Sequence, residues 1–308
     1  MPIFNFGSTN IDMVCKVDHI VLPGETINSS SFARSVGGKG ANQSVGASYA
    51  GGVKVFHVGK IGSDGLFIKD VLHEKGVDTT FLRVGETPTG LALIQVSSDG
   101  QNSIVLFGGS NKEFTSLEIE ETLSFAKKGD WVLITNEINC LSSIITKAYS
   151  KGLKICFNPA PFEKSVKHLP LELLDVLVLN EVEAEGLTSS KDPYVSIEKL
   201  SSIYKKAEII ITLGKNGVMH KKWGSLLTTY GVWRVPVVDT TAAGDCFIGT
   251  YIAYRSKNSS VKESLEKASI ASSITVMRKG AIASIPSYNE FTLITDYQYI
   301  PFNLRNQE

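Results

Sequence analysis

The strongest chemical pattern in this sequence is the run Asp239-Thr240-Thr241-Ala242-Ala243-Gly244-Asp245. An extended apolar stretch, Val232–Val238, precedes it, and an apolar stretch with helical character, Phe247–Tyr254, follows it. The three small residues before Asp245 allow backbone N–H groups to converge at a helix N-terminus, which binds anions. An aspartate there would repel phosphate, so Asp245 suits a general base that removes a proton from an attacking hydroxyl. Taken alone, the run also fits an ordinary helix start.

A glycine-rich run, Gly37-Gly38-Lys39-Gly40-Ala41-Asn42-Gln43, leads into a helix of small residues that we predict over Ser44–Ala50. The glycines permit close backbone approach, and Lys39 and Asn42 add polar groups suited to a hydroxylated ligand. A tight turn before a helix explains the same run equally well.

A third polar segment, Gly7-Ser8-Thr9-Asn10-Ile11-Asp12, leaves the first predicted strand. Side chains two residues apart on an extended chain point to one side, so Asn10 and Asp12 can face the same pocket. Amide and carboxylate groups of this kind can hold sugar hydroxyls. By itself, the segment is more simply interpreted as a polar turn.

Two further polar segments follow apolar runs that we predict to be buried strands. The segment Asn180-Glu181-Val182-Glu183 lies at the carboxyl end of such a run, where open α/β sheets bind ligands. Asn180 and Glu183 either share a helix face and hold Mg²⁺ largely through water, or form a helix N-cap. The segment Thr212-Leu213-Gly214-Lys215-Asn216-Gly217 ends a second run and is either a phosphate cradle or a hairpin turn.

The elements that must position these segments alternate between strands and helices. Predicted strands cover Ile3–Phe6, Val53–Val58, Trp131–Thr135, Leu153–Phe157, Val176–Leu179 and Ile209–Leu213, and predicted helices include Leu66–Lys75, Ser116–Lys127 and Ser142–Lys151. This alternation predicts a three-layer α/β/α sandwich with a central, mostly parallel sheet. Outside it, Leu91–Val96 and Ser103–Phe107 predict a β-hairpin around Asp99-Gly100, which is either peripheral or a lid over a site.

Length and composition narrow the class of protein. The chain has 308 residues, of which 43% are hydrophobic, with 31 basic and 31 acidic residues. This is enough apolar material for one large domain, and the zero net charge argues against a nucleic-acid partner. We find no apolar run long enough to span a membrane and no signal-peptide features at the start. With its four cysteines scattered, we expect a cytoplasmic protein with free thiols.

Two common nucleotide-binding motifs are missing from the sequence. Neither G-x-G-x-x-G nor G-x-x-x-x-G-K-[ST] occurs, which disfavours a dinucleotide oxidoreductase and a P-loop enzyme.

Considered together, the polar segments resemble those of the ribokinase-like (PfkB) family of carbohydrate kinases, from Gly7 to about Pro286. The most specific matches are GGKGANQ at 37–43, NPAP at 158–161, NEVEAE at 180–185, DTTAAGD at 239–245 and RKGA at 278–281. The GGKG and D-T-x-x-A-G-D patterns mark the family. GGKGANQ together with NPAP and RKGA is similar to the members that act on ribose.

This resemblance implies a role for each matching position. Asp245 would be the base for the 5-hydroxyl of the sugar, beside an anion hole formed by the N–H groups of Ala242, Ala243 and Gly244. The implied sugar contacts are Asn10, Asp12, Gly38, Lys39, Asn42 and Glu137, with Ala92, Ile94 and Ile104 as an apolar wall from the lid. Asn180 and Glu183 are implied for Mg²⁺ and the phosphates, and Thr212, Gly214 and Lys215 for ATP.

The resemblance also implies a monovalent cation, usually K⁺, near the anion hole. The matching positions are Asp239, Thr241, Thr275, Arg278, Gly280 and Ser284, mostly through backbone carbonyls. Alone, the segment at 278–281 is only the end of a helix predicted over Val261–Met277, with favourably placed cations.

The sequence departs from the family pattern at three places. Cys246 stands where the family commonly has Thr or Ser, Gly108-Gly109-Ser110-Asn111 replaces the more usual G-A-N, and the segment around Glu137 lacks the usual Pro. The last two lie near the expected sugar, so the substrate is less closely specified than the chemistry.

The expected reaction is the ATP-dependent phosphorylation of D-ribose at its 5-hydroxyl. Another sugar such as fructose, or a nucleoside such as adenosine, stays open as an alternative substrate. A second alternative, a non-catalytic sugar-binding protein, is disfavoured by the presence of Asp245. We expect residues 1–308 to form one kinase domain with lid segments at about 11–34 and 89–107. The exposed face of that lid predicts a homodimer.

Overall fold

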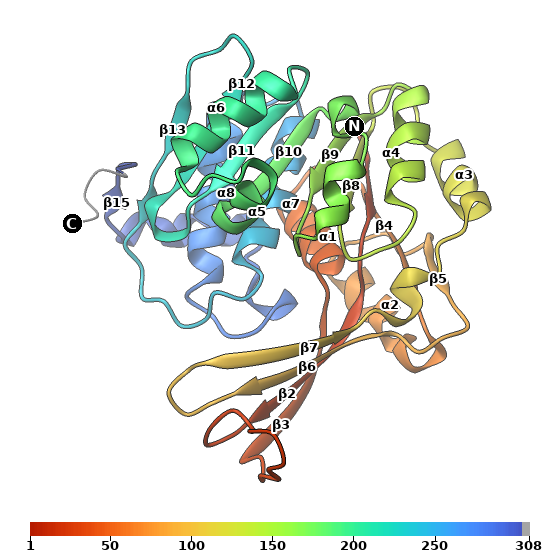
Figure 1. The fold of residues 1–308 in the computed structure, drawn as a ribbon, viewed down its shortest axis with the longest axis vertical. Coiled ribbons are helices and arrows are strands. Elements are labelled where there is room, and N and C mark those ends of the chain that lie inside the picture. The colour runs from red at the N-terminus through yellow and green to blue at the C-terminus, as the bar shows by residue number, and fades with distance from the viewer. Residues whose placement is uncertain (304–308) are drawn as a thin grey trace.

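The central feature of the computed structural model, which describes residues 1–303, is one large twisted sheet (Figure 1). Within these residues the sheet has nine strands, in the order β13 (Thr228–Tyr230), β12 (Val218–Lys222), β11 (Glu208–Thr212), β10 (Val176–Asn180), β9 (Lys154–Asn158), β8 (Trp131–Thr135), β1 (Ile3–Phe6), β4 (Val55–Ile61) and β5 (Leu82–Val84). The strands from β11 to β5 run parallel, while β12 and β13 at one edge are antiparallel. The predicted mostly parallel sheet is confirmed, with strand ends shifted by no more than a few residues.

Helices cover both faces of this sheet, because successive residues of each central strand enter different cores. Val178 and Ile210 pack into one core and Leu177 and Ile209 into the other. The first core is closed by α1 (Lys39–Tyr49), α2 (Phe67–Glu74), α7 (Ala243–Ser256) and α8 (Val261–Thr275), and the second by α3 (Ser116–Ser124), α4 (Leu141–Ser150), α5 (Glu181–Thr188) and α6 (Pro193–Ile203). Continuous apolar strands of this kind are the pattern of a sheet buried on both faces.

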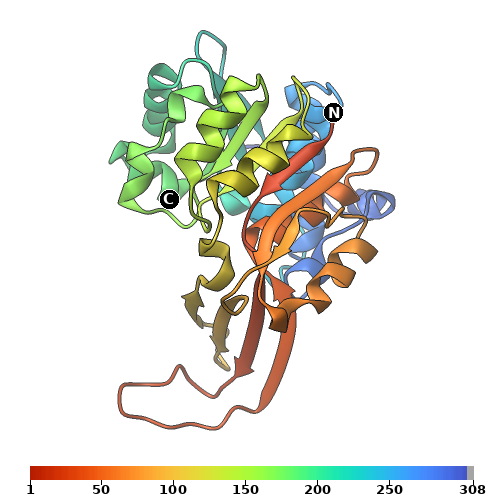
Figure 2. The same cartoon turned by 90° about the vertical axis from the view of Figure 1, so that its right-hand side faces the viewer.

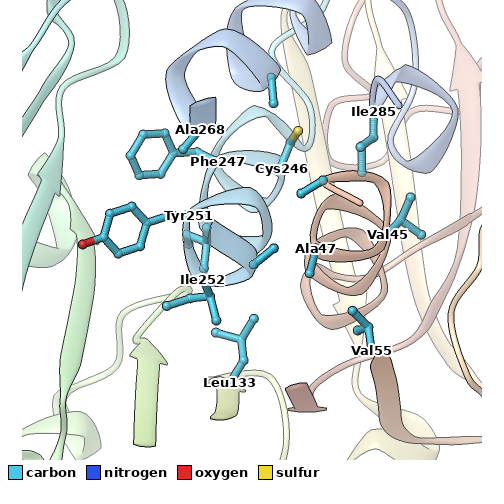
Figure 3. Close-up of a cluster of buried hydrophobic side chains, with 14 of the residues drawn as sticks. Val45, Ala47, Val55, Leu133, Cys246, Phe247, Tyr251, Ile252, Ala268 and Ile285 are labelled. Atoms are coloured by element: carbon cyan, nitrogen blue, oxygen red, sulfur yellow. The ribbon is translucent and has the colours of Figure 1, made fainter. Parts of the chain in front are cut away.

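Helices α1 and α7 pack directly against each other in the first core, where Figure 3 shows Ala47 on the side of α1 that faces α7. A Cβ added at Gly249 would lie 2.2 Å from the backbone oxygen of Gln43, so only glycine fits at that contact. Helix α1 also begins at Lys39, five residues before the predicted start at Ser44, because the turn is confined to Gly38, whose φ is 94°. The N-termini of α1 and α7 lie at the same end of the central sheet.

A smaller, four-stranded sheet extends away from the central sheet (Figures 1 and 2). Its order is β3 (Ser31–Gly37), β2 (Asn10–Lys16), β6 (Gly90–Val96) and β7 (Asn102–Phe107), and only the β2–β6 pair is parallel. The hairpin predicted around Asp99-Gly100 is confirmed as β6–β7. These strands begin and end within a few residues of the predicted lid segments, and we refer to this sheet as the lid.

The predicted extended stretch Val232–Val238 is a strand over only its first two residues. These form β14 (Val232–Trp233), which pairs with β15 (Tyr299–Ile300) near the end of the described chain.

A partly buried ionic cluster lies at the other end of the central sheet from the lid, at the start of β11. The carboxylate of Glu208 accepts hydrogen bonds from Tyr251 Oη at 2.8 Å and from Arg255 Nη2 at 2.7 Å. Burial alone would raise the pKa of Glu208, but His220, the charge of Arg255 and the Tyr251 hydroxyl outweigh it and lower the pKa to about 2. The ionised Glu208 thus ties β11 to α7.

We predict that Glu208→Gln lowers the free energy of unfolding at pH 7 by roughly 3 kcal/mol, because the shift of the pKa from 4.5 to about 2 measures the preference for the ionised form. A lowered pKa gives stability that is complete above pH 4.5 and is lost as the pH falls toward 2. The difference between wild type and variant in urea unfolding should therefore shrink below pH 4.5. Glu120→Gln, which breaks an exposed ion pair with Lys147, should change stability by less than about 1 kcal/mol.

Candidate active site

The centre of the candidate site is Asp245, a half-buried carboxylate in the first turn of α7. Asn42 Nδ2 donates to its Oδ2 at 3.0 Å, and Gln43 Nε2 donates to its Oδ1 at 3.1 Å. Burial raises the pKa of Asp245, and the charge of Lys39 and the two amide donors counteract part of that effect. The structure therefore joins the two predicted motifs, 37–43 and 239–245, at one carboxylate.

Lys39 and Glu137 form the charged wall beside Asp245. Lys39 Nζ lies 3.6 Å from Glu137 Oε1, and the Lys39 backbone N–H donates to Glu137 Oε2 at 3.3 Å. The hydroxyl of Ser8 also donates to Glu137 Oε2. Although the segment around Glu137 lacks the family's usual proline, its carboxylate is held at the start of α1.

Asp12 faces the same region from the lid strand β2 and is 9% exposed. Burial and the nearby charge of Glu137 raise its pKa to about 7, against the opposing effect of Lys39. A Cβ added at Gly37 would lie 2.0 Å from Oδ2 of Asp12. The glycine is therefore needed for close approach of β3 to this carboxylate, and the run at 37–43 is more than a tight turn.

The next sugar-contact candidate, Asn10, is held by a residue to which we assigned no role. Asn111 Nδ2 donates to Asn10 Oδ1 at 2.8 Å, and the backbone N–H of Thr9 donates to Asn111 Oδ1 at 2.9 Å. Asn111 ends the segment that departs from the family's G-A-N pattern, so its asparagine is retained in place. Only the pairing of residues about 100 positions apart reveals its contact with Asn10.

The predicted apolar wall of the lid is only partly assembled in this structure. Asp12 pairs with Ala92, and Ile94 pairs with Ile104, so these four residues share one face of the lid. Ala92 is 4% exposed, but Ile104 is 51% exposed. The face is continuous with the site at Asp12 and is open to solvent at Ile104.

A cleft of about 780 Å³ runs from the ends of β10 and β11 to the start of α7, a size suited to a nucleotide-sized ligand. The predicted residues Asn180, Thr212, Gly214, Lys215, Ala243 and Gly244 all line it. Much of the remaining lining is apolar and was not predicted: it includes Trp233, Val235, Phe247, Val276 and Ile300. Such residues carry no motif, because they need only be apolar and adjacent.

Backbone geometry at the start of α7 matches an anion hole only in part. Ala242 has a φ of 61°, and no side chain caps the helix. The N–H of Ala243 donates to the Thr240 carbonyl at 3.3 Å, so this predicted donor has a partner in the structure. A Cβ added at Gly244 would meet no atom within 4 Å, so this position opens into the cleft.

Asn180 and Glu183, predicted either as Mg²⁺ ligands or as an N-cap, do form the cap of α5. Asn180 Oδ1 accepts from the Glu183 N–H at 2.9 Å, and Glu183 Oε2 accepts from the Asn180 N–H at 2.8 Å. Burial raises the pKa of Glu183. Each carboxylate or amide oxygen has a further lone pair, so the donor set still fits a metal bound through water. Within residues 1–303 there is no group of three or more His, Cys, Asp or Glu that could hold a metal directly.

The two loops predicted to hold a monovalent cation lie side by side. Asp239 Oδ2 accepts from the Gly280 N–H at 2.9 Å, and Asp239 Oδ1 accepts from the Thr241 N–H at 2.9 Å. The guanidinium of Arg278 is paired with Glu290, and its backbone N–H donates to the Thr275 carbonyl at 3.1 Å. Thr275 and Ser284 are both fully buried at the ends of this region. The structure therefore brings the two predicted segments together through the Asp239 carboxylate.

Comparison with known proteins identifies a family whose activity fits the geometry of this site. A family model described as pfkB family carbohydrate kinase matches residues 3–288. The chain belongs to this family. The resemblance inferred from five motifs is thereby confirmed, and a pfkB-family carbohydrate kinase is a phosphotransferase that acts on an alcohol group.

Among its relatives, the pfkB-family chain is 34% identical to the ribokinase of Haemophilus influenzae, over 92% of this chain and 95% of that one. The structure of Cryptococcus neoformans ribokinase in complex with ADP is 33% identical and superimposes with a TM-score of 0.82, covering 95% of this chain and 99% of the other. Arabidopsis thaliana ribokinase complexed with ribose and ATP is 26% identical, with a TM-score of 0.84 and coverages of 96% and 99%. Among residues 1–303, no helix is long and apolar enough to cross a bilayer.

Proposed function

We propose that this protein is an ATP-dependent kinase that phosphorylates D-ribose at its 5-hydroxyl to give D-ribose 5-phosphate. The observation that carries the proposal is the position of Asp245, between the polar groups of the lid side and a nucleotide-sized cleft that reaches Gly244. The similarity to ribokinases over nearly the whole chain supports ribose as the sugar.

In this proposal, ribose lies between the lid and α1, with Asn10, Asp12, Lys39, Asn42 and Glu137 as its polar partners. The oxygen Oδ1 of Asn42 is buried and has no hydrogen-bond partner among residues 1–303, and a buried acceptor left unpaired is costly. A sugar hydroxyl donating to this oxygen would remove that cost. Gly38 and the apolar face of Ala92, Ile94 and Ile104 would complete the pocket when the lid closes and excludes water.

The transfer step follows from these positions. The 5-oxygen of ribose attacks the γ-phosphorus of ATP, the bond to the β-phosphate oxygen breaks, and the hydroxyl proton passes to Asp245. The N–H groups at the start of α7 would stabilise charge on the transferred phosphoryl group, while Thr212, Gly214 and Lys215 would lie along the ATP phosphates. Mg²⁺, held by Asn180 and Glu183 through water, would neutralise phosphate charge.

A substrate panel tests the proposed function directly. With ATP and Mg²⁺ present, we predict a higher kcat/KM for D-ribose than for fructose or adenosine, because the dense polar set around Lys39 suits a small, fully hydroxylated pentose. Coupled measurement of ADP release gives the ranking. Preference for adenosine or fructose would show that the substrate is wrong, while leaving the kinase chemistry in place.

Replacement of Asp245 by Asn should leave the fold and sugar binding intact and remove the base. We predict a fall in kcat of roughly 10⁴, the upper end of what general-base catalysis contributes. Turnover is measured after unfolding curves have shown an intact fold, and ribose binding is measured by calorimetry. Near-normal turnover of Asp245→Asn would contradict the mechanism.

Ribose affinity should depend on the ionisation of Asp12. Its raised pKa of about 7 means that the carboxylate, which accepts sugar hydroxyls, dominates above pH 7 and is lost below it. We therefore predict that the Kd for ribose, measured by calorimetry without ATP, rises as the pH falls from 8 toward 5.5. Asp12→Asn should bind more weakly and flatten this dependence. A pH-independent Kd in the wild-type protein would rule out Asp12 as the titrating contact.

Potassium should activate the enzyme, because an ion between the loops of Asp239 and Gly280 would fix the peptide units of the adjoining anion hole. We predict that kcat/KM rises when K⁺ replaces Na⁺ at constant ionic strength, with Mg²⁺ still required. Preorganised donors of this kind are worth a few kcal/mol when aimed at developing charge. Equal rates in K⁺, Na⁺ and a large organic cation would argue against the cation site.

The lid also supports a homodimer. Large apolar side chains at Phe32, Val105 and Phe107 are each more than half exposed and share the lid face opposite to Asp12, which is costly for an isolated molecule and typical of an interface. We propose that two lids pack together, which light scattering of the purified protein would detect as twice the chain mass. The four free cysteines are consistent with the cytoplasmic location that we propose.

A further inference from the structure

Gln43 is a fully buried amide whose role the sequence alone does not show. It lies on α1 directly after Asn42 and contacts the carboxylate of Asp245 through Nε2. The same nitrogen donates to Asn158 Oδ1 at 3.4 Å. Gln43 therefore connects the base candidate to the central strand β9.

The orientation of this amide is determined by a backbone carbonyl two contacts away. Asn158 Nδ2 donates to the carbonyl of Val178 in β10 at 3.0 Å, and a carbonyl can only accept. Asn158 therefore presents its oxygen to Gln43, and Gln43 must present its NH₂ group. A reversed Gln43 amide would also place its oxygen against the carboxylate oxygen of Asp245, which is repulsive.

The two amides on Asp245 differ in what else they can contact. Both have a buried oxygen without a hydrogen-bond partner among the described residues, but Asn42 is also a sugar contact in the proposed function. Gln43 is anchored by Asn158 on the rigid sheet. The amide that donates to Oδ1 of Asp245 is therefore also bonded to a residue of the central sheet.

We propose that Gln43 is a positioning residue for the transfer reaction: its amide, oriented by Asn158 and Val178, holds Oδ1 of Asp245, while Oδ2, which accepts from Asn42, keeps a lone pair for the sugar hydroxyl. This inference rests on the proposed function, in which Asp245 is the base. A chain of hydrogen bonds runs from the Val178 carbonyl through Asn158 and Gln43 to Asp245. These bonds fix the reacting carboxylate relative to the central sheet. Because the carboxylate of Asp245 is already held in place, it does not have to reorient at the moment of proton transfer.

The hydrogen bond from Gln43 also favours the ionised form of Asp245. The charged groups facing this carboxylate are Lys39, which favours ionisation, and Glu137 and Glu183, which oppose it. With burial and two carboxylates acting against ionisation, loss of a neutral donor should shift the acid limb of the rate profile to higher pH.

The test compares Gln43→Met, which keeps the length of the side chain but removes its donors, with Val45→Ala, a buried packing change two residues further along α1. For Gln43→Met we expect kcat to fall about 10- to 100-fold, within the range for a lost preorganised donor. The acid limb of kcat should move to higher pH, while KM for ribose and ATP changes less than about threefold. Val45→Ala should unfold at lower temperature and keep the wild-type pH profile.

Two further variants keep the proposal testable if Gln43→Met does not fold. Gln43→Glu, which adds a like charge, should move the acid limb to a higher pH than wild type, and Asn158→Ala, which releases the amide, should move it in the same direction by less. Wild-type kcat and pH profiles in the folded Gln43 variants would overturn the role of Gln43.

Assaying Asp245→Asn in parallel distinguishes a failure of the positioning role of Gln43 from a failure of Asp245 as the base. An inactive Asp245→Asn with an unchanged Gln43→Met would refute only the positioning role. An active Asp245→Asn would refute the base, and the inference with it.

Discussion

The close contact between α1 and α7 is the constraint on which the rest of the site depends. Gly249 allows the backbone of Gln43 to approach α7, and Gly46 allows the same beside Cys246. A side chain at either position would separate the helices and withdraw the Asn42 and Gln43 amides from Asp245. The small residues that look unremarkable in the sequence therefore set the hydrogen-bond distances at the candidate base. Cys246, which departs from the family pattern, is a buried packing residue of this contact.

Charge is distributed around this contact so that no carboxylate is left without a partner. Lys39 forms an ion pair with Glu137, and its positive charge also favours ionisation of Asp245 and Glu183. One cation thus acts on four acids, Asp12 included, and burial raises the pKa values of Asp245 and Glu183. A polyphosphate with bound metal would add both negative and positive charge here, so the balance of ionisation in this region is set jointly by protein and ligand.

The cleft presents a mainly apolar surface to a ligand, whereas the lid side presents polar side chains. The cleft offers apolar lining from Trp233, Val276 and Ile300, which come from separate parts of the chain. The lid side offers Asp12, Asn10 and their supporting amide Asn111. This division suits one ligand with a planar apolar part and phosphates and another with many hydroxyls, and Asp245 lies where the two would meet.

Local patterns in the sequence determined the layered fold, because buried parallel strands such as Val176–Leu179 are nearly continuous in apolar residues and helices alternate with them. They also located Asp245, Lys39 and Asn180 at strand and helix ends, where the chain carries polar residues beside glycine. Tertiary structure alone decided which of these groups touch. The contacts of Gln43 with Asp245 and of Asn111 with Asn10 join residues 202 and 101 positions apart. Such contacts depend on helix packing and strand register, which no local pattern encodes.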